Sequence, residues 1–78
     1  MQTDSKISKT ETILIKINGE NKFIPQNISI VELLEIFKIN KERVVIELNK
    51  EIIKKDRYNS ISIKENDGFE IITFVGGG

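Results

Sequence analysis

Apolar residues alternate with polar ones near the start of the chain. Between residues 12 and 18 isoleucine occupies every second position, which is the period of a half-buried β-strand. These residues are Ile13, Ile15 and Ile17. The pair Asn18-Gly19 follows, and both residues tolerate the positive φ angles of a tight hairpin turn. A return strand over residues 22–24 ends at Pro25, which has no backbone N–H to donate to a neighbouring strand. The first third of the sequence therefore predicts an antiparallel hairpin.

A helix is predicted next, from a capping pattern and from helical spacing. Ser29 and Glu32 form an S-x-x-E capping box, in which each side chain accepts a hydrogen bond from the backbone N–H of the other residue. Apolar residues then recur at helical spacing and give one apolar face. They are Ile30, Leu33, Leu34 and Phe37. We expect the helix to span residues 30–38, with Asn40 as the left-handed residue that ends it.

The second half of the chain predicts further strands separated by turns. The expected strands are residues 44–48, 51–53 and 69–75. Asn49-Lys50 and Asn66-Asp67-Gly68 provide turns, and a polar loop over residues 54–60 carries Tyr58 as a packed anchor. One amphipathic helix can cover one face of such a sheet. The pattern therefore predicts an α+β fold, with a mixed sheet of four to five strands packed on one main helix.

The two ends of the chain differ from this pattern. Residues 1–10 are polar apart from Met1 and Ile7, so we expect a disordered lead-in. Residues 11–75 form the predicted domain, and residues 76–78 form a flexible glycine tail.

Composition excludes several classes of function. Twelve basic and twelve acidic side chains cancel and are scattered, which gives no basis for binding nucleic acid or a membrane surface. There is no long apolar run and no signal-peptide pattern, so we expect a cytoplasmic protein. Histidine and cysteine are absent, which removes the usual proton-transfer side chain and the thiolate metal ligands. We therefore expect no metal site, no catalytic residue and no enzyme activity of its own.

The segment Phe74-Val75-Gly76-Gly77-Gly78 is the strongest candidate for chemistry. An apolar strand runs directly into three glycines, and the reactive group at this end is the α-carboxylate of Gly78. Glycines let backbone enter a narrow cleft without steric conflict. From Val75 the extended tail reaches roughly 10–13 Å at 3.3–3.6 Å per residue. This length is sufficient to place the carboxylate inside a partner's active site.

Taken together, these features resemble the ThiS family, the sulfur carrier proteins of thiamine biosynthesis. The matching stretches are Ile30-Val31-Glu32-Leu33-Leu34, Val44-Val45-Ile46-Glu47-Leu48-Asn49, Glu51-Ile52-Ile53, Tyr58, Glu70-Ile71-Ile72 and Phe74-Val75-Gly76-Gly77-Gly78. The resemblance implies a ubiquitin-like β-grasp fold in which the first and last strands are parallel neighbours. Two stretches depart from the family pattern: Lys54-Lys55 replaces a frequent Pro-Arg, and Glu65-Asn66-Asp67 replaces a frequent Asp-Gly-Asp.

The resemblance also implies a reaction in which this chain is the substrate of other enzymes. An E1-like adenylyltransferase (ThiF-like) couples the Gly78 carboxylate to AMP, using ATP and magnesium that the partner binds. A sulfur donor such as a cysteine desulfurase then converts Gly78 to a thiocarboxylate. Thiazole synthase (ThiG-like) finally receives the sulfur. The carrier itself is expected to bind no cofactor.

A docking surface for these partners follows from strand alternation. If Phe69 and Ile71 point into the core, neighbouring residues of the last strand point outward, and we expect them beside outward residues of other strands. The predicted partner-binding residues are Phe74, Val75, Ile72, Leu14 and Val45. A small basic cluster, Lys54, Lys55 and Arg57, either meets an acidic partner surface or is a solvated loop.

Three other readings remain at this point. The chain could be the small subunit of molybdopterin synthase (MoaD-like) or another ubiquitin-like sulfur carrier. It could be a protein modifier that is joined through Gly78 to lysines of its targets. It could also be an interaction module with an incidental tail.

Overall fold

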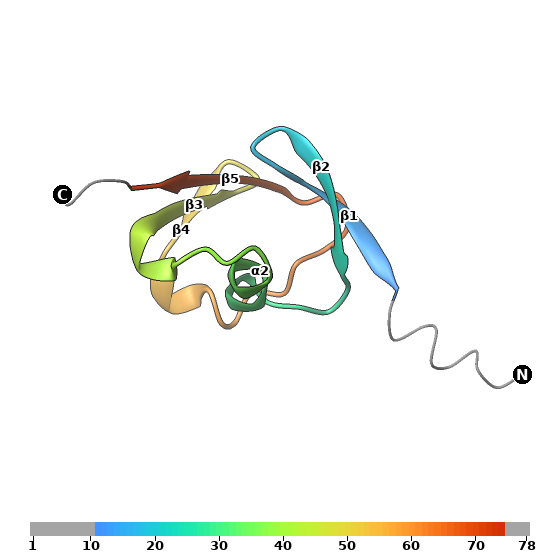
Figure 1. The fold of residues 1–78 in the computed structure, drawn as a ribbon, viewed down its shortest axis with the longest axis horizontal. Helices are drawn as coiled ribbons and strands as arrows, with labels where there is room; N and C mark the ends of the chain where they lie inside the picture. The colour runs from blue at the N-terminus through green and yellow to red at the C-terminus, as the bar shows by residue number, and fades with distance from the viewer. Residues whose placement is uncertain (1–10, 75–78) are drawn as a thin grey trace, which may run out of the picture.

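In the computed structural model, which describes residues 11–74, five strands form one sheet and a single α-helix lies across one of its faces (Figure 1). The elements are β1 (Thr12–Ile17), β2 (Glu20–Pro25), α2 (Ile30–Ile36), the 3-10 turn η1 (Lys41–Arg43), β3 (Val44–Leu48), β4 (Glu51–Ile53), the 3-10 turn η2 (Lys55–Arg57) and β5 (Gly68–Thr73). The predicted lead-in (1–10), Val75 and the predicted tail (76–78) lie outside the described residues.

The last strand lies in the middle of the sheet, whose strand order is β2-β1-β5-β3-β4. It runs parallel to β1 on one side and antiparallel to β3 on the other. The mixed sheet and its single described α-helix confirm the α+β fold, and the expected parallel pairing of the first and last strands is confirmed as well. The strands on either side of β5 each belong to an antiparallel hairpin, β1–β2 on one side and β3–β4 on the other.

The hydrophobic core lies between the helix and the inner face of the sheet. Its buried side chains are Ile15, Ile24, Ile30, Leu33, Leu34, Val44, Ile46, Ile53, Tyr58, Ile63, Phe69 and Ile71. Strand alternation predicted the inward positions correctly, and Tyr58 is buried as the expected anchor of its loop. Burial of one such side chain contributes about 1.5–3 kcal/mol. A domain of this size therefore depends on nearly all of them.

Both hairpin turns have the backbone conformation that their sequences predict. Asn18 and Gly19 have φ angles of 51° and 85°, and Asn49 and Lys50 have 52° and 73°. Two consecutive positive φ angles match the right-handed twist of the flanking strands. In the turn before β5, Asn66 also has a positive φ of 70° and so can stand where glycine is more frequent.

The capping box at the start of α2 is confirmed. The Glu32 N–H donates to Ser29 Oγ at 3.2 Å, and the Ser29 N–H donates to Glu32 Oε1 at 2.9 Å. These two bonds satisfy backbone donors that the first helical turn leaves without partners.

The residue predicted to end the helix was wrong. The helix stops at Ile36, and the left-handed residue is Lys38, with φ 59°, whereas Asn40 has φ −77°. The Ile39 N–H donates to the Leu34 carbonyl at 2.8 Å and the Lys38 N–H to that of Glu35 at 3.1 Å. These two backbone hydrogen bonds turn the chain so that the half-buried Ile39 packs against the core. The packing of Ile39 therefore decides where the helix ends. Asn40 instead caps η1, where its Oδ1 accepts from the Glu42 N–H.

The last strand is also shifted from its predicted range of 69–75. It begins at Gly68 and ends at Thr73, although the Phe74 N–H still donates to the Arg43 carbonyl at 2.8 Å. The backbone beside β3 therefore stays bonded through the last described residue.

Removal of the helix cap tests how strongly α2 depends on it. Ser29→Ala should lower the free energy of unfolding by about 1 kcal/mol, because the Glu32 N–H loses its acceptor. Urea denaturation measures the loss. Ser62→Ala removes an exposed hydroxyl on the neighbouring segment and serves as the control. Equal stability of the two variants would contradict the capping role.

Candidate functional site

The face of the sheet that the helix does not cover carries exposed apolar residues at the end of β5. Phe69 and Ile71 point into the core, whereas Ile72 and Phe74 are 54% and 53% exposed. The predicted facing of the last strand is thus confirmed. An exposed Phe and Ile that lie two residues apart on one strand form the start of an interaction surface.

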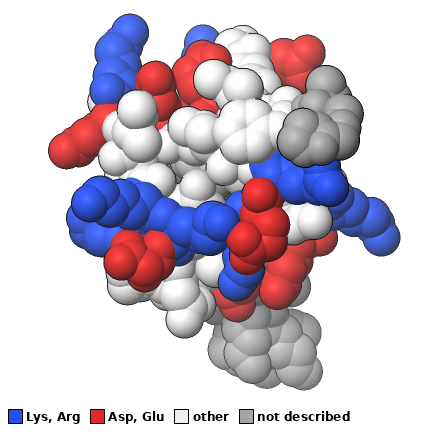
Figure 2. Space-filling model, turned by 90° about the vertical axis from the view of Figure 1, so that its left-hand side faces the viewer, with Lys and Arg blue, Asp and Glu red and all other residues white. Residues whose placement is uncertain are grey.

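Two residues of neighbouring strands extend this apolar surface. Val45 of β3 is the direct cross-strand partner of Ile72 and is half-buried. Ile52 of β4 is 65% exposed and pairs with Glu47, which places it diagonally from Val45. We call Val45, Ile52, Ile72 and Phe74 the strand-end patch. Figure 2 views this end of the molecule and shows an uncharged area above a band of Lys and Arg side chains.

The sequence placed Leu14 in this patch, and that placement was wrong. In the parallel register Lys16 pairs with Gly68, and the Leu14 carbonyl accepts from the Asn66 N–H. Ile72 lies six residues further along, roughly 20 Å away at 3.3 Å per residue. Leu14 instead pairs with Phe23, which is 72% exposed, at the other end of the sheet. Alternation determines which face a side chain occupies but not its position relative to a distant strand.

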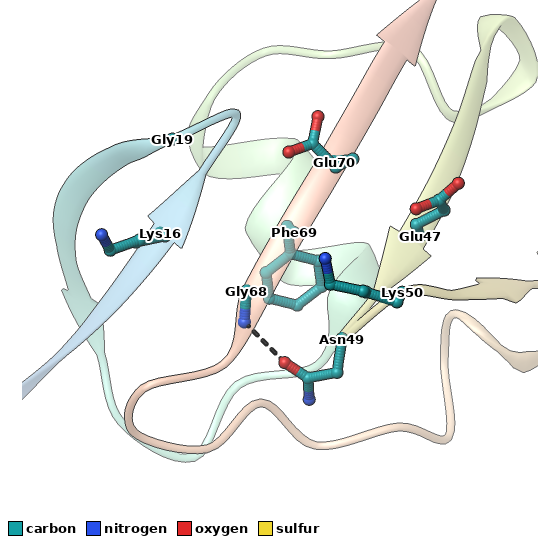
Figure 3. A pocket seen from close by; sticks show the side chains of 8 residues that line it. All are labelled: Lys16, Gly19, Glu47, Asn49, Lys50, Gly68, Phe69 and Glu70. Carbon is teal, nitrogen blue, oxygen red and sulfur yellow. Dashed lines mark hydrogen bonds between the residues drawn. The ribbon is translucent and has the colours of Figure 1, made fainter.

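An open hollow of about 310 Å³ lies between the strand-end patch and the apolar pair Leu14 and Phe23 (Figure 3). It is lined by Lys16, Gly19, Glu47, Asn49, Lys50, Gly68, Phe69 and Glu70. Figure 3 shows that the charged lining residues come from different elements, Lys16 from β1, Glu47 from β3, Lys50 from the turn after β3 and Glu70 from β5. The middle of the outer face is therefore charged with both signs, in contrast to the strand-end patch.

The two 3-10 turns gather charge beside the end of β5. Lys55 Nζ lies 2.7 Å from Glu42 Oε1, and this hydrogen bond and the lysine charge lower the pKa of the Glu42 carboxyl. The pair joins η2 to η1, so Lys41 and Arg43 lie at the same end as the predicted basic cluster of residues 54–57. Both members of the ion pair are exposed, and such a pair adds little to stability.

The remaining predicted site residues, Val75 and the three glycines, lie outside the described residues. Sequence reasoning missed Ile52 and Phe23, although strand alternation at 51–53 carried the signal for Ile52. Within residues 11–74 no group of three or more Asp, Glu, His or Cys side chains could hold a metal ion. In the same range no helix has the length and apolarity needed to span a membrane.

Comparison with known proteins identifies close relatives. The model of the ThiS family matches residues 12–78. The sulfur carrier protein ThiS of Bacillus subtilis is 36% identical over 66 residues, which cover 83% of this chain and all of that protein. An uncharacterised protein, ycf40, of Trieres chinensis is 38% identical over 74 residues, 95% of this chain and 99% of the relative.

Two further comparisons concern a solved structure and a longer protein. The crystal structure of the thiamine biosynthesis protein ThiS from Geobacter metallireducens superposes with a TM-score of 0.73 at 28% identity, and covers 85% of this chain and 100% of that one. A thiazole synthase of Paramagnetospirillum magneticum is 32% identical over 62 residues, which are 80% of this chain but 19% of that protein.

Two adjacent isoleucines of β5 test the facing of the strand. Ile72→Lys should change the free energy of unfolding by no more than about 0.5 kcal/mol, because the new charge stays in water. Ile71→Lys should prevent folding, because it buries an unpaired charge in the core. Circular dichroism during urea denaturation measures both. If Ile71→Lys folded and Ile72→Lys did not, the result would show that Ile72, and not Ile71, points into the core.

Proposed function

Because this chain belongs to the ThiS family, we infer that it is a sulfur carrier protein of thiamine biosynthesis and is not itself a catalyst. The observation that carries this conclusion is the extent of the family match, which begins at β1 and runs through Gly78. The fold supports it, since β5 lies in the centre of the sheet and is the last described strand before those residues (Figure 1).

We propose that the α-carboxylate of Gly78 is the group that carries sulfur. A carboxylate is a poor acyl donor, and adenylation supplies a leaving group. The Gly78 oxygen attacks the α-phosphorus of ATP and releases pyrophosphate. The terminal sulfur of the donor's persulfide, such as that of a cysteine desulfurase, then attacks the acyl carbon and AMP leaves, which gives an acyl disulfide. A thiol such as free cysteine reduces this disulfide by forming a new disulfide with the donor sulfur, and Gly78 is released as a thiocarboxylate.

ATP and magnesium belong to the partner in this proposal. Phosphoryl transfer requires cationic groups and a metal ion around the phosphates. An E1-like adenylyltransferase supplies them, and the carrier supplies the terminus together with a surface to dock. The strand-end patch suits that docking, because it is apolar, exposed and continuous with the strand that leads to Gly78.

Thiazole synthase is the proposed recipient of the sulfur. The thiazole synthases of Paramagnetospirillum magneticum and Magnetococcus marinus each contain a segment similar to this chain, 32% and 30% identical. In those proteins a carrier-like segment and the synthase belong to one polypeptide. This association supports a direct encounter between this carrier and a separate thiazole synthase.

Intact-mass analysis tests the proposed modification. The full chain is incubated with a ThiF-like adenylyltransferase, Mg-ATP and a cysteine desulfurase with cysteine. The C-terminal fragment should gain the mass difference between sulfur and oxygen, and omission of ATP should abolish the gain. Deletion of Gly77 and Gly78 should also abolish it. An unchanged mass with partners that modify the Bacillus subtilis carrier would reject the proposed function.

Two exposed phenylalanines at opposite ends of the outer face test the docking surface. Phe74→Ala should raise the KM for the carrier in ATP-dependent pyrophosphate release about tenfold, since truncation of a central interface residue costs more than 1 kcal/mol. Phe23→Ala removes an even more exposed ring from the other end and should leave the KM unchanged. Equal KM values for both variants would exclude the strand-end patch as the docking site.

A further inference from the structure

Two asparagines occupy equivalent positions in the two hairpin turns, and both reach β5 with their side chains. Asn18 and Asn49 are each the first residue of a turn with positive φ. Asn49 Oδ1 accepts from the Gly68 N–H at 2.9 Å, and its Nδ2 donates to Asp67 Oδ1 at 3.1 Å. Asn18 Oδ1 accepts from the Ile71 N–H at 2.8 Å, and its Nδ2 donates to the Ile71 carbonyl at 3.1 Å.

The Asn18 side chain takes the place of one more residue of β1. Backbone pairing of β1 with β5 covers only Lys16 with Gly68 and Ile17 with Phe69. The Asn18 N–H donates to the Phe69 carbonyl at 2.8 Å, and the chain then turns away into β2. A side-chain amide offers the same donor and acceptor as a peptide group. Asn18 therefore satisfies both the backbone N–H and the carbonyl of Ile71 at the point where β1 ends.

This contact divides β5 into two parts. Up to Ile71 the strand is held on both sides, by β1 or Asn18 and by β3. Beyond Ile71 only the β3 side remains, through the pairing of Thr73 with Val44 and the bond from the Phe74 N–H to the Arg43 carbonyl. Ile72 and Phe74 of the strand-end patch lie in this second part. The direction in which they project thus depends on the last two-sided anchor.

We propose that Asn18 is a positioning residue, which fixes β5 at Ile71 so that the strand-end patch meets the adenylyltransferase in one orientation. The inference rests on the proposed function. A surface that is ordered before binding loses less entropy when the complex forms. Loss of the anchor should therefore raise KM, whereas kcat should stay unchanged, because Asn18 touches no reacting group.

The matched variants Asn18→Gly and Asn49→Gly separate positioning from stability. Glycine suits both turns, so backbone conformation is kept, and each variant loses two side-chain hydrogen bonds to the segment 67–71. Both should be destabilised by similar amounts in urea. Asn18→Gly should raise the KM for the carrier in pyrophosphate release about tenfold, the effect expected when hydrogen bonds of this strength are lost. Asn49→Gly should leave KM and kcat as in the wild type.

Amide hydrogen exchange provides a second readout. The Ile71 N–H should exchange faster in Asn18→Gly than in Asn49→Gly at equal global stability. Asn18→Asp replaces Asn18→Gly if the latter does not fold, because aspartate still accepts from the Ile71 N–H and tolerates positive φ but cannot donate to the Ile71 carbonyl. It should also raise KM.

The outcomes distinguish the two proposals. If the wild-type chain reacts and the Asn18 variants keep its KM, the positioning role is overturned and the carrier function stands. The same holds if Asn49→Gly raises KM equally, since the effect would then follow stability alone. If the wild-type chain releases no pyrophosphate with an active enzyme, the carrier function fails and the positioning role fails with it.

Discussion

The pairing of β5 between β1 and β3 is the constraint on which the rest of the structure depends. One face of this strand contributes Phe69 and Ile71 to the core, and the other face presents Ile72. The strand that anchors the domain is therefore also the strand that presents its surface. A terminal strand at the edge of the sheet would lack partners on one side along its whole length. In the central position it begins with partners on both sides, and its last residues keep one.

This arrangement suits a sulfur carrier of the ThiS family. The charges of the chain cancel, and it has neither histidine nor cysteine. The folded part supplies an apolar patch at the end of the outer face, on the strand that precedes the C-terminal residues. The charged hollow borders that patch, since Glu47 pairs with Ile52, whereas Leu14 and Phe23 lie at the other end of the sheet. Both ends of the outer face therefore carry apolar side chains, but only the strand-end patch lies on the strand that precedes the C-terminal residues.

Much of the fold could be predicted because its signals are local. The Ser29–Glu32 box, the Asn18-Gly19 turn and the alternation of isoleucines each act within a few residues, and each is found as expected. The predictions that failed depend on contacts between distant segments. Lys38 ends the helix because Ile39 packs on the core, and Leu14 lies far from Ile72 because of the β1–β5 register. The role of Asn18 was hidden for the same reason, since its partner is 53 residues away.

Backbone amide shifts of the full, ¹⁵N-labelled chain, titrated with the adenylyltransferase, test the central claim most directly. We predict that changes concentrate at residues 72–74, Val45 and the residues after Phe74, with the amides of Leu14 and Phe23 unchanged. Changes centred on the β1–β2 hairpin would show that the adenylyltransferase binds the other end of the sheet. That result would contradict the claim that β5 both anchors the domain and presents the strand-end patch to the adenylyltransferase.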